Sequence, residues 1–103
     1  MEELLKVTET FLIAGRGLLL QPALPWPGSG SFKTFRARVE IQTPAGASTE
    51  LDAVFTAEHL SLVGGRSRWD IAVVLPDATK QQVPVGSVVR TTPESIRALQ
   101  GRT

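Results

Sequence analysis

Cysteine and tyrosine are absent from this chain of 103 residues, and histidine and methionine occur once each. Without thiols, the chain can form neither disulfides nor thiolate metal sites, and it offers no cysteine nucleophile. One histidine gives little basis for a histidine-based metal centre. We therefore expect no metal, no cofactor and no catalytic thiol, and the lack of disulfides is typical of a cytoplasmic protein.

The sequence also lacks an excess of one charge. The chain contains eleven Lys and Arg residues and ten Asp and Glu residues, so its formal net charge is +1. No overall field favours nucleic acid or a membrane surface, and electrostatic binding would need a local patch. No apolar run approaches the roughly 18 residues of a membrane span, and the acidic start does not have the form of a signal peptide. We expect no membrane contact.

Short segments with a two-residue period are what the chain does contain. Phe35, Val39 and Ile41 fall on one face of their segment, and Arg36 and Arg38 fall on the other. This alternation is typical of half-buried strands and predicts an all-β, antiparallel barrel or sandwich. The segments that read as strands are 7–14, 34–42, 49–57, 69–75 and, broken by Pro84 and Gly86, 83–90.

Proline and glycine mark the connections, and one helix is predicted at the end. The stretch "PALPWPGSGS" at 22–31 is too rich in both for a regular element. In "TTPESIRALQ" a threonine cap, Pro93 in the first turn and Gly101 after the last turn predict a short helix. No repeat or boundary appears, so we predict that residues 1–103 form one domain, with a barrel over about 7–90 and a helical tail at 91–103.

Three blocks resemble the second domain of translational GTPases such as elongation factor Tu. In "VTETFLIAGRGLLL" at 7–20, the matching residues are Val7, Phe11, Ile13 and Gly15-Arg16-Gly17. The segments "VEI" at 39–41 and "RWDIAVVLPDATKQQVPVGSVV" at 68–89 follow in the family's order. The resemblance implies a six-stranded Greek-key β-barrel and a binding role in translation.

Gly15-Arg16-Gly17 has two interpretations, a phosphate loop or a turn between strands. A phosphate loop needs further glycines, a Lys-Ser/Thr pair and a following helix. Here Leu18-Leu19-Leu20 follows and reads as a strand, so we predict a turn. Without a Walker motif, neither a nucleotide cofactor nor GTP hydrolysis is expected of this chain.

The resemblance also implies a pocket, which in elongation factor Tu holds the aminoacyl-adenosine end of tRNA. Where the family has Glu, Arg and Asn, this chain has Thr56, His59 and Asp70, and the apolar positions keep their character. The positions that match the family pocket are Ile13, Leu19, Thr56, Glu58, His59, Asp70 and Val74.

A basic face is the second candidate site. Arg36 and Arg38 share one strand face, and arginines beside aromatic rings suit contact with an RNA backbone and bases. The alternative is a set of solvated arginines balanced by nearby carboxylates. The candidate contacts with RNA or a partner are Arg16, Arg36, Arg38, Arg68 and Trp26, and Trp26 could instead cover the barrel as a lid.

A catalytic interpretation would need His59 with a nucleophile such as Ser61 or Ser67 and an orienting acid. Proximity in sequence alone supports it, so we expect no catalytic residues and no enzyme. The main hypothesis is a non-catalytic binding module that contacts RNA or the translation machinery. The alternative is a small protein-interaction module or regulator that keeps the barrel and has lost tRNA binding. The sequence leaves the oligomeric state open.

Overall fold

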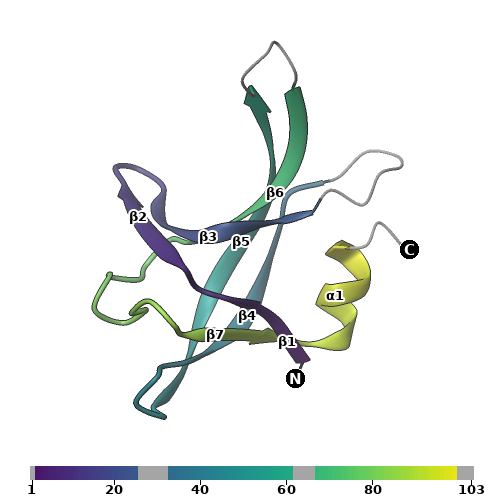
Figure 1. Ribbon diagram of the computed structural model, residues 1–103. Helices are drawn as coiled ribbons and strands as arrows, with labels where there is room; N and C mark the ends of the chain where they lie inside the picture. Colours follow the sequence, from purple (N-terminus) through teal and green to yellow (C-terminus); the bar gives the residue numbers. More distant parts are fainter. Residues whose placement is uncertain (1, 26–32, 62–66, 100–103) are drawn as a thin grey trace.

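One antiparallel sheet makes up most of the described chain, followed by a short helix (Figure 1). The computed structural model describes residues 2–25, 33–61 and 67–99, with the backbone alone at 25, 59–61 and 67–69. The strands are β1 (Glu2–Lys6), β2 (Glu9–Ile13), β3 (Gly17–Pro25), β4 (Phe35–Gln42), β5 (Ser48–Ser61), β6 (Ser67–Leu75) and β7 (Val88–Thr91), and the helix is α1 (Pro93–Leu99). The all-β prediction is confirmed.

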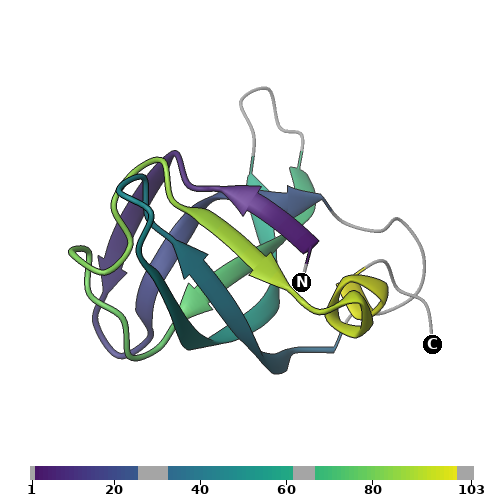
Figure 2. The same ribbon diagram turned by 90° about the horizontal axis from the view of Figure 1, so that it is seen from below.

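The strands lie in the order β1-β7-β4-β5-β6-β3-β2, and every neighbouring pair is antiparallel. The sheet curls into a half-barrel, visible when the molecule is turned (Figure 2). Its two edge strands, β1 and β2, are consecutive in the chain. Between them, the Val7 amide donates to the Ser87 carbonyl and the Thr8 amide donates to the Gln21 carbonyl, both at 2.8 Å. At Val7 and Thr8 the chain therefore leaves β1, at one end of the sheet, and enters β2, at the other end.

Three strands differ from the sequence prediction. β3 continues to Pro25, so the first four residues of the stretch 22–31, predicted to be irregular, belong to a strand. β1 lies before the expected start of the barrel and pairs with β7, although its acidic sequence gave little strand signal. β7 begins at Val88 rather than at 83. Proline cannot donate a ladder hydrogen bond, and around Pro84 the chain turns instead, with the Ser87 amide and hydroxyl both donating to the Pro84 carbonyl.

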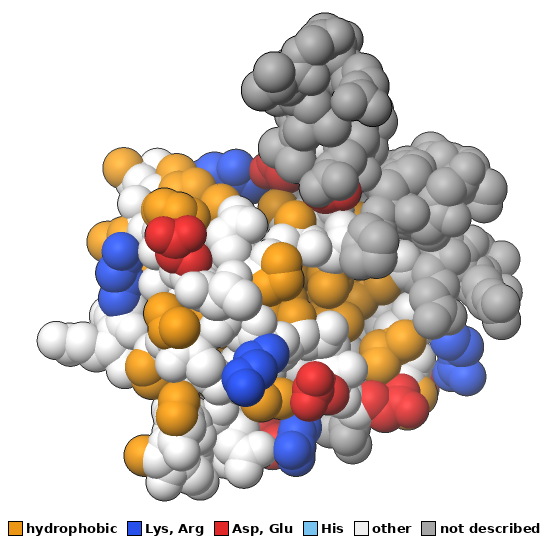
Figure 3. Space-filling view, in the orientation of Figure 1, with side chains coloured by type: hydrophobic (Ala, Val, Ile, Leu, Met, Phe, Trp, Pro, Cys, Tyr) orange, Lys and Arg blue, Asp and Glu red, His pale blue; other side chains and the backbone are white. Residues whose placement is uncertain are grey.

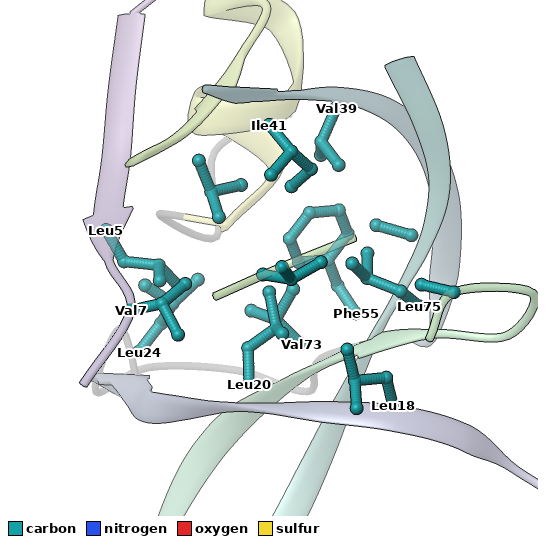
Figure 4. Close-up of a cluster of buried hydrophobic side chains, with 14 of the residues drawn as sticks. Leu5, Val7, Leu18, Leu20, Leu24, Val39, Ile41, Phe55, Val73 and Leu75 are labelled. Atoms are coloured by element: carbon teal, nitrogen blue, oxygen red, sulfur yellow. The ribbon is translucent and has the colours of Figure 1, made fainter. Parts of the chain in front are cut away.

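The core lies on the concave face of the sheet (Figure 4). Phe55 on β5 is its largest fully buried side chain, and its ring stacks on that of Phe35 with centroids 4.9 Å apart. On β4, Val39 and Ile41 are fully buried, as the alternation predicted. The cluster also contains Leu5, Val7, Leu18, Leu20, Leu24, Ala53, Ile71, Val73, Leu75 and Val89.

The Gly15-Arg16-Gly17 segment is a turn between β2 and β3, as predicted. The Arg16 amide donates to the Ile13 carbonyl at 3.1 Å, and Gly15 has a φ of 80°. Gly17 has a φ of 122°, and a Cβ there would lie 2.5 Å from the Leu75 carbonyl oxygen. Glycine therefore serves two purposes, a left-handed backbone and a close approach of β3 to the end of β6.

The predicted helix is present as α1. The Thr92 hydroxyl accepts a hydrogen bond from the Ser95 amide at 3.2 Å, which is the expected cap. Leu99 is 7% exposed and joins the core, while Ile96 is half-buried. Nowhere in the described ranges does a helix have the length and apolar character needed to cross a bilayer.

Candidate binding surface on the outer face of the sheet

The convex face of β3, β6 and β5 carries most of the residues that the sequence indicated as a pocket. Neighbouring residues of a strand point to opposite faces. Because Phe55 and Val73 point into the core, Val54 and Val74 point away from it. Cross-strand partners share a face. We call this surface the outer patch, and it consists of Ile13, Leu19, Val54, Thr56, Ala72 and Val74.

The centre of the outer patch is apolar. Val74 pairs with Leu19 of β3 on one side and with Val54 of β5 on the other, so three apolar side chains form a row across the strands. Val74 and Ala72 are only 3% and 4% exposed, although neither belongs to the core cluster. Leu19 and Val54 remain half-buried. Other side chains therefore cover the middle strand, and the flanking strands offer apolar surface to solvent.

An ion pair crosses this surface. Arg16, in the β2–β3 turn, donates to Glu58 of β5 at 2.6 Å. In the sheet order, β3 and β6 lie between the turn and β5, so the pair reaches over the outer patch. The two side chains are 44% and 36% exposed. Exposed pairs of this kind contribute at most about 1 kcal/mol, so the main consequence is that the charge of Arg16 is already matched.

Polar groups complete the margin of the patch. The Thr34 hydroxyl donates to the Thr56 hydroxyl at 2.9 Å, which links the start of β4 to β5. Asp70 is 8% exposed and pairs in register with Glu58, so two carboxylate residues lie opposite each other on β6 and β5. Arg36 pairs in register with Val54, which places an exposed guanidinium on the same face beside the patch.

The structure places six of the seven family pocket positions on this one face. Ile13 and Leu19 come from the β2–β3 hairpin, and the polar position Thr56 comes from β5. Glu58, Asp70 and Val74 belong to the same face by strand alternation. The backbone of His59 pairs with that of Trp69, and the side chain of His59 lies outside the described atoms.

Two of the three described arginines that were predicted as candidate contacts, Arg16 and Arg38, form ion pairs. Arg38 donates to Asp52 at 3.3 Å, and Arg90 lies 3.8 Å from Glu40. Among the cations named as candidate contacts whose side chains are described, Arg36 alone has no hydrogen bond or ion pair within the described part of the chain. Arg16 lies at the far side of the outer patch. Trp26 and the Arg68 side chain fall outside the described atoms.

The described residues bear on metal binding but leave the catalytic interpretation untested. Over these residues, no group of three His, Asp or Glu side chains comes close enough together to hold an ion. The side chains of His59, Ser61 and Ser67, which a catalytic interpretation would require, belong to the atoms left undescribed. That interpretation therefore stays a hypothesis drawn from the sequence.

Two members of the outer patch escaped the sequence analysis, Val54 and Ala72. The signal that could have revealed them is the run "IAVVL" at 71–75. Apolar residues at successive positions indicate a strand that is covered on both faces, whereas strict alternation indicates a strand covered on one. The sequence of β6 therefore already predicts that its outer face is covered by other side chains or by a partner.

The comparisons with known proteins add no relative. No protein-family model, curated protein or solved structure matches this chain. The fold and the outer patch define a class, an all-β half-barrel with an apolar surface on its convex face. The likeness to the second domain of translational GTPases stays a prediction from the residues quoted above.

Proposed function

We propose that this protein is a non-catalytic binding module that holds a protein partner on the outer patch. The observation that carries the proposal is the row of Leu19, Val74 and Val54 on the convex face. Interface centres are apolar and poor in unpaired charge, and their rims are polar. The row is the apolar centre, and the polar Thr56 and Arg36 lie at its margin.

The partner's chemistry follows from the charges at the margin. Arg36 is exposed beside Val54, and no hydrogen bond or ion pair is described for it. A partner that presents apolar side chains next to a carboxylate would fill the patch and pair with this guanidinium. RNA is the less favoured ligand, because Arg16 and Arg38 already have acidic partners.

The finer fold belongs to the same proposal. Val7 and Thr8 hydrogen-bond toward β7 and β3 respectively, so β1 and β2 could act as one bent strand. The sheet would then close as the six-stranded Greek-key barrel of the translation-factor second domain. A cytoplasmic location, and contact with the translation machinery through a protein subunit, fit this view and are part of the proposal.

The test is affinity capture from native lysate with the bound protein and RNA both identified. We expect a protein that wild type retains and that Val54→Lys and Arg36→Glu lose. Thr49→Lys is the matched control, because it adds the same charge to an exposed position of β5 away from the patch. A protein that all three variants retain equally, or RNA as the only retained species, would refute the proposal.

A further inference from the structure

The two edges of the sheet differ in how they are protected. A strand at the end of a sheet presents unpaired N–H and C=O groups, and proteins usually block such edges with charge, proline or a bulge. β1 carries Glu2, Glu3 and Lys6, has a register shift between Glu3 and Leu5, and also contacts β3. β2 has none of these devices except Glu9, its one charged residue.

β2 is also the most apolar exposed strand of the described chain. Leu12 is 65% exposed and Phe11 is 43% exposed, and the only other exposed large apolar side chain in the described ranges is Val85. Figure 3 shows hydrophobic side chains gathered over β2 and over the segment that follows β6. From the side opposite β3, no backbone hydrogen bond reaches residues 9–12 within the described part of the chain.

We propose that β2 is a self-association edge, at which two copies of this chain pair through antiparallel β2 strands. The partner that we propose for β2 is the β2 strand of a second copy of the same chain. A two-fold antiparallel pairing centred on Phe11 sets Phe11 opposite Phe11, Thr10 opposite Leu12 and Glu9 opposite Ile13. This is the only symmetric register that pairs all five residues of β2.

Side-chain contacts favour this register. The two Phe11 rings would lie opposite each other on the convex face, and cross-strand aromatic pairs stabilise sheets. On the other face, Leu12 would lie opposite the second copy's Thr10 and lose much of its exposed surface. The paired sheets would continue as one, and the outer patches of both copies would lie on the same side of it.

Charge does not oppose the pairing. Each Glu9 faces Ile13 of the other copy, so the two carboxylates are four residues apart along the strand direction. At about 3.4 Å per residue, this separation is about 14 Å, which exceeds the Debye length of about 8 Å at physiological ionic strength. Two copies could in principle also pair through their β1 strands, in a register centred on Leu4 that sets Glu2 opposite Lys6. The register shift between Glu3 and Leu5 makes β1 irregular and interrupts such a ladder.

Sedimentation over a concentration series tests the proposal directly. We expect a monomer–dimer equilibrium between roughly 10 μM and 1 mM, as mass action requires of a reversible dimer. Leu12→Lys places a charge on the edge and should weaken dimerisation at least about tenfold. Ala45→Lys adds the same charge at the exposed β4–β5 turn and should leave the equilibrium unchanged. A wild-type monomer at every concentration, or a dimer that Leu12→Lys leaves intact, overturns the proposal.

A cross-link tests the register and covers the case in which Leu12→Lys fails to fold. The chain has no cysteine, so Phe11→Cys introduces a single thiol. In the proposed register the two copies' Cα atoms at position 11 lie about 4.5–5.5 Å apart, which is within disulfide range. Mild oxidation should yield a covalent dimer of Phe11→Cys and none of Ala45→Cys. Equal cross-linking of both variants, or none of Phe11→Cys, refutes the register. Val54→Lys, which tests the partner site, should leave the dimer unchanged.

Discussion

Gly17 shows how one residue ties the β2–β3 hairpin to the rest of the sheet. Its φ of 122° is a conformation that other residues rarely adopt, and its missing Cβ lets the Leu75 carbonyl approach. Gly15 shares the left-handed backbone, with a φ of 80°, but has no atom within 4 Å of the position where a Cβ would stand. A side chain at Gly15 would therefore cause backbone strain alone, whereas a side chain at Gly17 would cause both backbone strain and a steric clash.

We predict that Gly17→Ala lowers the free energy of unfolding by about 3 kcal/mol, because strain and a backbone clash add. Gly15→Ala is the matched control and should cost about 1 kcal/mol, the left-handed strain alone. Urea denaturation of the two variants and wild type provides the measurement. Equal losses for both alanines would show that the approach to Leu75 is relaxed without cost.

At the scale of elements, the structure confirms the predicted start of α1, whereas Gly101, the predicted end signal, lies outside the described residues. Thr92 accepts the amide of Ser95 and also donates to the Ser95 hydroxyl at 3.1 Å. The helix has only seven residues, too few to be stable alone. It persists because its cap is satisfied and Leu99 packs into the core.

Thr92→Ala should therefore cost about 1 kcal/mol in thermal or urea unfolding, since the capping bond is lost. Thr79→Ala is the control, because Thr79 is exposed and its hydroxyl makes no bond to another described residue. Its effect should stay within about 0.5 kcal/mol. If the two substitutions cost the same, the cap contributes nothing beyond the general loss of a threonine.

At the scale of the whole molecule, ligand choice depends on how the charges are distributed. The net charge is +1, and the described arginines near the outer patch are mostly matched by carboxylates. RNA would have to displace Asp52 from Arg38 to use the stripe that the sequence suggested. A protein partner needs no such exchange, because the apolar row is already partly accessible at the half-buried Leu19 and Val54.

We accordingly expect no saturable RNA binding by wild type at low salt. The decisive comparison is wild type against the Arg36→Ala/Arg38→Ala double variant at two salt concentrations. The RNA hypothesis holds if wild type binds RNA and the double variant binds more weakly, by about 1 kcal/mol for each lost contact. The slope of log affinity against log salt concentration should then also fall by about two. The protein-partner proposal would then fail.

The sequence by itself determined what depends on local pattern. The two-residue period placed Val39 and Ile41 inside and Arg36 and Arg38 outside, because a strand's geometry requires alternation. Glycine fixed the β2–β3 turn, and the threonine cap with Pro93 fixed the start of α1. These features need only a few neighbouring residues, so no knowledge of the fold was required.

Only the tertiary structure decided what depends on pairing between distant segments. β1 is a strand because β7 supplies its hydrogen-bond partners, which its acidic sequence does not announce. Arg16 and Glu58 are 42 residues apart and meet because the curled sheet brings the hairpin over β6. The β4–β5 register sets Arg38 directly opposite Asp52, so the charge of Arg38 is matched and the stripe is less basic in space than in sequence. Cross-strand register, which no single segment encodes, set both the outer patch and the exposed edge at β2.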